Sequence, residues 1–208
     1  MTAPNKQLKY FSEGAGIFPG RNYPAFSKLE YLIDILNNKN RINHIGLFGS
    51  ASVGKTTASQ IFAKEVNAEF IYINCASFTN TSQLIDLLLA STAFPSKPKI
   101  DLATNQKYTA PDNRVVICFD EAHMLSKKLQ NELLSALDPN TLWTGLNNPK
   151  TKLKVCLSST SCLFATTNKS RLLGPLVSRL VSVIFIPYEA YDIEQSIVTG
   201  KQIGRAHV

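Results

Sequence analysis

The sequence predicts an α/β protein in which helices cover both faces of a five-stranded parallel sheet. Strand-like and helical segments alternate from about residue 27 to residue 187. A glycine-containing loop joins the first strand to a helix, and residues 115–119 form a fully apolar strand followed by two acidic residues. Parallel neighbours need crossover connections, usually helices, so the alternation favours a parallel sheet. A strand that is apolar on both faces is typical of the centre of such a sheet.

The first predicted element is an amphipathic helix, because apolar residues recur at helical spacing from Phe26 to Leu36. The same periodicity predicts the later helices, and short apolar runs between them predict the strands. Helices are expected at residues 27–38, 55–66, 81–90 and 126–137. Strands are expected at residues 42–48, 69–74, 114–120, 161–166 and 180–187. We expect these elements to form one core domain at residues 25–188.

Three segments break this alternation. Residues 1–24 are rich in Gly, Pro, Asn and aromatic residues without a period, and are expected to form an irregular arm. Residues 91–113 contain three prolines. They are long for a connection, because loops above about 15 residues are usually functional or disordered. Residues 139–159 contain Trp143, an Asn-Asn-Pro turn signal and an alternating run, a pattern that predicts a β-hairpin inserted in the core.

The composition indicates a folded cytoplasmic protein. Hydrophobic residues make up 44% of the chain and charged residues 18%, which is enough to bury a core. The apolar runs are far shorter than the ~20 residues that span a bilayer, and the first residues lack a secretory signal, so we expect no membrane contact. The four cysteines lack metal-ligand spacing and are expected to be reduced core thiols. A net charge of +7 suggests a nucleic-acid partner.

The end of the chain is treated separately. Residues 203–208 read Ile-Gly-Arg-Ala-His-Val, which matches the translated opening of a widely used sequencing adapter. We interpret this segment as a read-through artefact rather than as a short basic C-terminus, and we expect the gene to continue beyond it.

Residues 49–56 match the phosphate-loop pattern, between the predicted strand 42–48 and the predicted helix 55–66. Glycines let the backbone amides wrap around phosphate oxygens, and the helix N-terminus adds a partial positive charge. Lys55 is expected to reach the β and γ phosphates of ATP, and the Thr56 hydroxyl to ligate Mg²⁺. The alternative is an ordinary turn. The predicted nucleotide-binding residues are Gly49, Ser50, Ala51, Ser52, Val53, Gly54, Lys55, Thr56 and Thr57.

Asp120 and Glu121 follow the apolar strand, at the sheet edge where the phosphate loop must also lie. Asp120 is therefore predicted to hold Mg²⁺ and to complete the nucleotide site, and Glu121 to orient and polarise the attacking water. Taken alone, two acids after a strand would more often belong to the first turn of a helix. The phosphate loop upstream favours the catalytic interpretation.

With these motifs, the chain resembles the AAA+ ATPases from residue 42 to residue 188, and among them the RuvB-type Holliday junction branch-migration helicases. The resemblance lies in the phosphate loop, the acidic stretch at residues 120–125, Leu-Phe-Ala-Thr-Thr-Asn at residues 163–168 and Leu-Gly-Pro-Leu-Val-Ser-Arg-Leu at residues 173–180. It implies a three-layer P-loop core that binds ATP and Mg²⁺. It further implies ATP hydrolysis in a homo-oligomeric ring, a hexamer, that moves DNA in recombination or repair.

The resemblance also assigns residues. Thr167 matches a sensor that touches the γ phosphate or the attacking water, with Asn168 as the neighbouring alternative. Arg179 matches an arginine finger that enters the ATP site of the ring neighbour, with Arg171 as a weaker candidate. The alternative for Arg179 is a surface salt bridge, because loop arginines are usually solvated.

The resemblance also bears on the molecule that the ATPase would act on. The 139–159 hairpin occupies the place where RuvB-type proteins contact an accessory protein or the DNA junction. Its Trp143 is either an anchor for a partner or part of the domain's own packing. Residues 189–202 would begin a helical lid that is cut short. The long 91–113 connection and the unmatched arm depart from the pattern, so a protein-remodelling or clamp-loader-type ATPase is the alternative function.

Overall fold

The computed structural model describes residues 22–39, 43–95, 97–100, 105–137, 145–148, 151–157 and 160–189. The predictions for Trp143, for the residues from 190 onward and for the arm before residue 22 therefore concern residues outside the described ranges. Among the described residues, no helix has the length and apolar character needed to cross a membrane.

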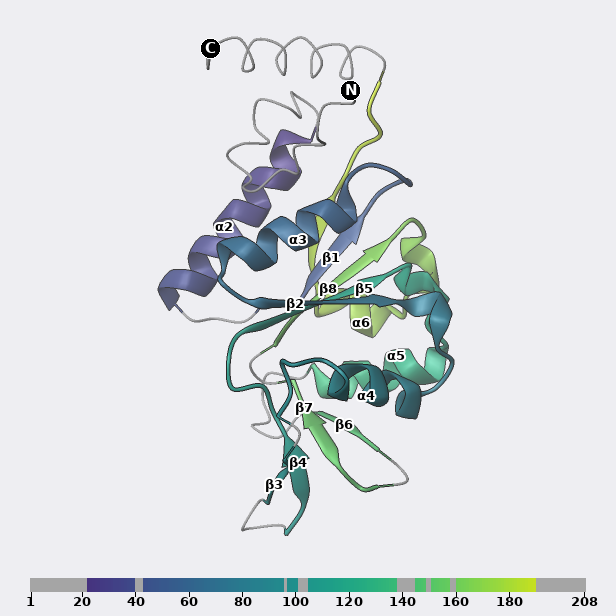
Figure 1. The fold of residues 1–208 in the computed structure, drawn as a ribbon. Helices are drawn as coiled ribbons and strands as arrows, with labels where there is room; N and C mark the ends of the chain where they lie inside the picture. Colours follow the sequence, from purple (N-terminus) through teal and green to yellow (C-terminus); the bar gives the residue numbers. More distant parts are fainter. Residues whose placement is uncertain are drawn as a thin grey trace, which may run out of the picture.

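The main sheet is the predicted five-stranded parallel sheet (Figure 1). Its strands are β1 (Ile45–Phe48), β2 (Glu69–Asn74), β5 (Val115–Asp120), β8 (Thr160–Thr166) and β9 (Val181–Ile184). Their order is β2-β5-β8-β1-β9, and each neighbouring pair is parallel. The fold class is therefore confirmed, and β5 and β8 lie between other strands, as their apolar sequences predict.

Two hydrophobic clusters cover the two faces of this sheet. In β5, Val116 and Cys118 belong to the cluster formed with the first two helices, and Ile117 and Phe119 belong to the cluster formed with the later ones. Successive side chains of a strand point to opposite faces, so both faces of the sheet are buried. The helices are α2 (Tyr23–Lys39), α3 (Lys55–Glu65), α4 (Thr81–Leu89), α5 (Lys127–Ala136) and α6 (Gly174–Ser178). Single 3₁₀ turns are η1 (Cys75–Ser77), η2 (Ala122–Met124) and η3 (Lys169–Arg171).

Helix α2 begins at Tyr23, four residues before the predicted start, so the end of the predicted irregular arm is helical. The preceding residue, Asn22, is fully buried. Its Nδ2 donates to the Ile186 carbonyl at 2.9 Å and its Oδ1 accepts from the Ile186 N–H at 2.7 Å. This pair of bonds fastens the start of α2 to the chain just after β9. A contact between residues so far apart in sequence has no local signal.

A second sheet joins the two segments that broke the predicted alternation. Strands β3 (Lys99–Ile100) and β4 (Lys107–Thr109) come from the long connection, and β6 (Gly145–Asn147) and β7 (Lys154–Cys156) from residues 139–159. The order is β3-β4-β7-β6, in which β4 and β7 are parallel and the outer pairs are antiparallel. The sheet lies beyond α4 and α5, away from α2 (Figure 1). The long connection is thus part of a sheet, which the sequence analysis did not predict.

All four cysteines are free and buried. Burial raises the pKa of Cys75, Cys156 and Cys162, and raises that of Cys118 to about 12. These thiols are therefore protonated at neutral pH and pack as small apolar side chains.

Candidate nucleotide-binding site

The loop between β1 and α3 has the backbone shape of an anion-binding turn. Ser52 and Gly54 both adopt left-handed conformations, with φ of 62° and 89°. Helix α3 begins directly afterwards at Lys55. A turn of this kind followed by a helix N-terminus directs backbone N–H groups and a partial positive charge toward one point. At Gly54 the backbone conformation itself favours glycine.

Gly49 is required for a different reason. A Cβ at this position would lie 2.5 Å from the carbonyl oxygen of Phe185, the first residue after β9. The neighbouring Phe48 carbonyl accepts the Phe185 N–H at 2.7 Å. The start of the phosphate loop therefore lies directly against the backbone that leaves the sheet.

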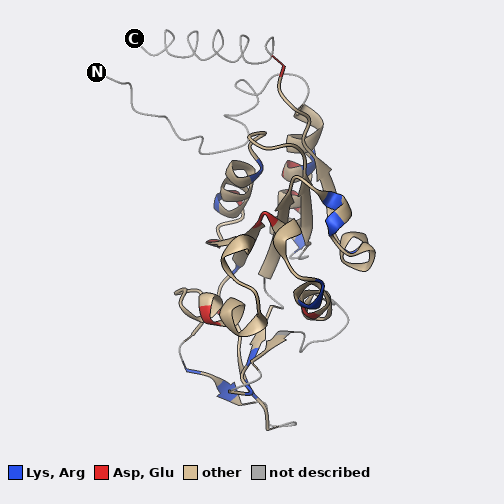
Figure 2. Ribbon diagram, turned by 90° about the vertical axis from the view of Figure 1, so that its right-hand side faces the viewer, with Lys and Arg blue, Asp and Glu red and all other residues tan. Residues whose placement is uncertain are grey.

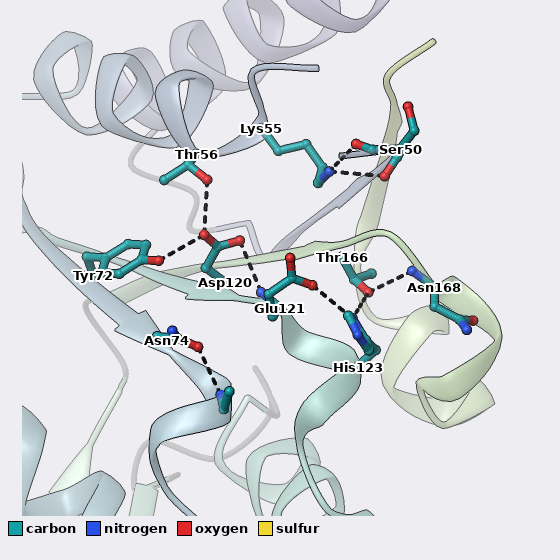
Figure 3. Close-up of polar contacts among 12 residues, drawn as sticks. Ser50, Lys55, Thr56, Tyr72, Asn74, Asp120, Glu121, His123, Thr166 and Asn168 are labelled. Atoms are coloured by element: carbon teal, nitrogen blue, oxygen red, sulfur yellow. Dashed lines mark hydrogen bonds and ion pairs between the residues drawn. The ribbon is translucent and has the colours of Figure 1, made fainter. Parts of the chain in front are cut away.

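Lys55 lies over the loop. Its side chain is mostly buried, and its Nζ donates to the carbonyls of Gly49 at 3.0 Å and Ser50 at 2.6 Å (Figure 3). Burial lowers the pKa of this amine, while the negative charges of Glu121 and Asp120 raise it. A partly desolvated ammonium bonded to neutral carbonyls is stabilised by an added anion, so a phosphate is a fitting ligand here.

Asp120 is the centre of a second group of contacts, at the end of β5. Its Oδ2 accepts from the Thr56 hydroxyl at 3.1 Å and from the Tyr72 hydroxyl at 3.0 Å, and its Oδ1 accepts from the Glu121 N–H at 3.0 Å. Burial, and then the hydrogen bond to Asp120 and its charge, raise the pKa of Tyr72 to about 12. Tyr72 therefore remains a donor that orients the carboxylate at neutral pH.

The residues at this position fit Mg²⁺. The Thr56 hydroxyl and the Asp120 carboxylate, both oxygen ligands, are 3.1 Å apart. Within the described part of the chain, no group of three or more His, Cys, Asp or Glu side chains could hold a metal ion. One carboxylate and one hydroxyl suit a Mg²⁺ that takes its other ligands from substrate phosphates and water.

Glu121 has a left-handed backbone, with φ of 52°, which is uncommon for a residue other than glycine. Its Oε2 lies 3.2 Å from Nδ1 of His123, and the same nitrogen lies 3.0 Å from the Thr166 hydroxyl at the end of β8 (Figure 3). The Thr166 hydroxyl also accepts the Asn168 N–H at 3.0 Å. Glu121 is therefore connected through His123 to the neighbouring strand and to the loop that follows it.

The structure brings most of the predicted site residues together at one sheet edge, but not all. Thr167, the predicted sensor, is exposed, and it is the buried Thr166 that enters the contacts with His123. Asn168 contributes its backbone N–H, while its side chain accepts from Ser170 at 2.7 Å. Arg179 follows α6, and its guanidinium donates to the Leu134 carbonyl of α5.

Tyr72, His123 and Thr166 are residues that the sequence analysis did not assign to the site. The period of two along β8 was a usable signal for Thr166, because side chains one residue apart on a strand point to opposite faces. For His123 the only sequence feature that could have assigned it to the site is its position two residues after Glu121. Tyr72 has none, since its contact depends on the pairing of β2 with β5.

The fold and this site define a phosphate-loop nucleotide-binding protein, with the loop, a hydroxyl–carboxylate pair and a second acidic residue at the ends of parallel strands. The sequence pattern of the "ATPase family associated with various cellular activities (AAA)" matches residues 45–188. The chain belongs to this family, and membership implies an ATP site.

The individual relatives that match the chain share one description. Proteins described as Holliday junction branch migration complex subunit RuvB are 25% identical over 170 residues in Phytoplasma mali and 25% identical over 167 residues in Acholeplasma laidlawii. These alignments cover 81% and 79% of this chain but only 45% and 43% of the relatives. The chain thus spans about half the length of the relatives it matches.

Solved structures agree on the fold. The RuvB Holliday junction branch migration motor of Thermotoga maritima superposes with a TM-score of 0.65 at 19% identity, over 96% of this chain and 55% of that one. A mutant of the same protein gives a TM-score of 0.69 at 18% identity, over 96% of this chain and 56% of that one.

We expect Lys55→Ala to weaken ATP binding roughly 10- to 100-fold, because hydrogen bonds to charged groups contribute about 1.5–3 kcal/mol. Titration calorimetry with ATP measures the change. Lys64→Ala, at an exposed position of the same helix, is the matched control and should bind ATP like the parent. Unchanged affinity of the Lys55→Ala protein would show that the phosphates bind elsewhere.

Proposed function

We propose that the protein is an ATP-hydrolysing motor domain that acts on DNA as a RuvB-like branch-migration ATPase in recombination or repair. The observation that carries the proposal is the convergence of Lys55, the Thr56–Asp120 pair and Glu121 at one edge of the sheet. Each of these groups has a place in phosphoryl transfer, which depends on positioning and on charge stabilisation. The RuvB relatives give the DNA-directed role its support.

The roles of the residues follow from their chemistry. Lys55 and the loop amides would hold the β and γ phosphates, and Thr56 and Asp120 would hold Mg²⁺, whose charge stabilises the transferred phosphoryl group. Glu121 would orient and polarise the attacking water. Thr167 and Asn168 remain the proposed sensor, joined now by Thr166, whose hydroxyl faces His123.

Assembly is part of the proposal. We assign Arg179 as a finger that acts in the site of a neighbouring subunit, so hydrolysis would require a ring, with a hexamer as the expected form. The guanidinium lies at the exposed C-terminal end of α6, where a second subunit can reach it. An accessory protein could contact the 139–159 region, whose described part belongs to the second sheet.

The second sheet supports DNA rather than protein as the client. Backbone register places Lys99, Tyr108, Lys154 and Asn147 in one row across all four strands. Lys99 and Asn147 are exposed and the other two are half-buried, whereas the adjacent row, Thr109, Val155 and Leu146, is buried. The outward row thus places Tyr108 between Lys99 and Lys154, a combination of an aromatic side chain with two amines that suits bases and phosphates. Lysine positions in the second sheet are blue in the lower part of Figure 2. Lys99 also pairs with Asp112 at 3.1 Å, an exposed ion pair that a phosphate can replace.

The test is the salt dependence of binding to a four-way DNA junction. Replacing Lys99 and Lys154 with glutamine should reduce the slope of log affinity against log salt by about 1.8, because each phosphate contact contributes about 0.9. The double variant Lys28→Gln/Lys64→Gln removes the same charge from exposed positions on α2 and α3 and should keep the parental slope.

Two outcomes would count against the DNA-directed role. One is a slope that does not respond to the Lys99/Lys154 pair. The other is ATP turnover that rises with unfolded protein but not with the junction, which would favour the protein-remodelling or clamp-loader-type alternative.

A further inference from the structure

We propose that His123 is a positioning residue that holds the Glu121 carboxylate through a proton on Nδ1 and couples it to the loop after β8. The inference rests on the proposed ATP hydrolysis, because it concerns the group expected to activate water. It starts from one nitrogen that contacts two oxygens, Glu121 Oε2 at 3.2 Å and Thr166 Oγ1 at 3.0 Å.

The proton on Nδ1 follows from the donors and acceptors present. An ionised carboxylate only accepts hydrogen bonds, so a bare Nδ1 facing Glu121 would set two acceptors against each other. The Thr166 oxygen already accepts the Asn168 N–H at 3.0 Å, and it keeps a second lone pair for another donor. An Nδ1–H shared between Glu121 and Thr166 gives both oxygens a donor, so the geometry assigns the proton to this nitrogen.

The two side chains differ in exposure, so that His123 is held by its surroundings and Glu121 is much freer to change orientation. The His123 side chain is 17% exposed and the Glu121 side chain 46% exposed. Thr166, whose hydroxyl contacts the same ring nitrogen, is 1% exposed. A half-exposed glutamate samples several rotamers, and a water-activating group loses effectiveness when its orientation varies. The buried threonine and the ring together provide a fixed support from β8.

The contact also provides coupling. Asn168, which bonds to the same hydroxyl, begins the loop that contains η3 and leads to α6, and Arg179 directly follows α6. A displacement of this loop changes the Thr166 hydroxyl, then the His123 ring and then the Glu121 carboxylate. His123 thus links the group that activates water to the segment proposed to face the neighbouring subunit.

The test uses a pair of isosteric variants. Asparagine can place an N–H donor where Nδ1 stands, whereas aspartate of the same shape offers only acceptors. We expect His123→Asn to keep kcat within about threefold of the parent, and His123→Ala to lower it about tenfold. His123→Asp should lower kcat further than alanine does. The affinity for ADP should stay the same in all three variants, so that the effect is in kcat.

Thr166→Val supplies the second measurement, since valine has the shape of threonine without its hydroxyl. Its effect on kcat should be smaller when His123 is already alanine, because the two side chains act through one contact. Equal kcat for His123→Asn and His123→Asp, or strictly additive effects with Thr166→Val, would overturn the inference while the parent still hydrolyses ATP. Absence of hydrolysis by the assembled parent would instead overturn the proposed function.

Discussion

Replacing Arg179 with alanine is expected to lower the ATP turnover of assembled rings by about 10³- to 10⁵-fold, the range over which an arginine supplied to a phosphoryl-transfer site acts. ATP binding should change little, because Arg179 lies after α6, where its guanidinium donates to the Leu134 carbonyl of α5. Phosphate release under steady state measures the effect. The melting temperature of the variant checks that the lost contact with α5 does not unfold the domain.

Arg171→Ala is the matched control, because Arg171 is also exposed and lies in η3, in the same connection between β8 and β9. It should retain most of the turnover. A large loss in Arg171→Ala with none in Arg179→Ala would move the finger to Arg171.

Mixing two kinds of variant subunit shows whether Arg179 acts in the ATP site of a neighbouring subunit or in that of its own subunit. Subunits with Arg179→Ala keep Glu121, and subunits with Glu121→Gln keep Arg179, so a shared interface can contain both intact groups. Mixed rings should recover part of the turnover. No recovery in rings shown to be mixed would exclude the trans assignment.

Glu121→Gln is expected to lower kcat by about 10²- to 10⁴-fold, the usual contribution of a positioned general base. Glutamine keeps the size of the side chain but cannot accept a proton from water. ATP affinity should stay within a few-fold of the parent, because we propose that the loop and Lys55, rather than Glu121, hold the phosphates. Single-turnover and equilibrium binding measurements separate the two quantities.

Asp86→Asn removes one exposed carboxylate from α4 and should leave both quantities unchanged. If Glu121→Gln lost ATP affinity and kept kcat, Glu121 would be a binding residue and the water-activating role would fall to another group.

The parts of the fold that depend on local sequence were predictable. The phosphate loop sets its own geometry within eight residues, and the apolar run of β5 places Asp120 at the sheet edge from its composition alone. In the second sheet, the antiparallel β6–β7 pair lies within the predicted hairpin at residues 139–159. The pairing of β4 with β7 was not predictable, because these strands are short and come from segments far apart in the chain. Pairing of that kind depends on tertiary contacts rather than on periodicity.

The site shows the same division. Lys55, Thr56, Asp120 and Glu121 follow from motifs whose chemistry requires those residue types. The choice between Thr166 and Thr167 depends on the face of the sheet toward which each side chain points. Adjacent residues point to opposite faces, so an alignment that is shifted by one residue selects the wrong threonine. A resemblance between sequences fixes the segment more reliably than the side chain within it.

Gly49 lies so close to the backbone of Phe185 that the phosphate loop and the chain leaving strand β9 are expected to move together. No side chain stands between the two backbones, so no rotamer change can absorb a displacement of one against the other. The bond from Phe185 to Phe48 and the clamp of Asn22 on Ile186 tighten the same joint. We therefore expect a displacement of the backbone just after β9 to shift the phosphate loop with it, and a displacement of the loop to shift that backbone in turn.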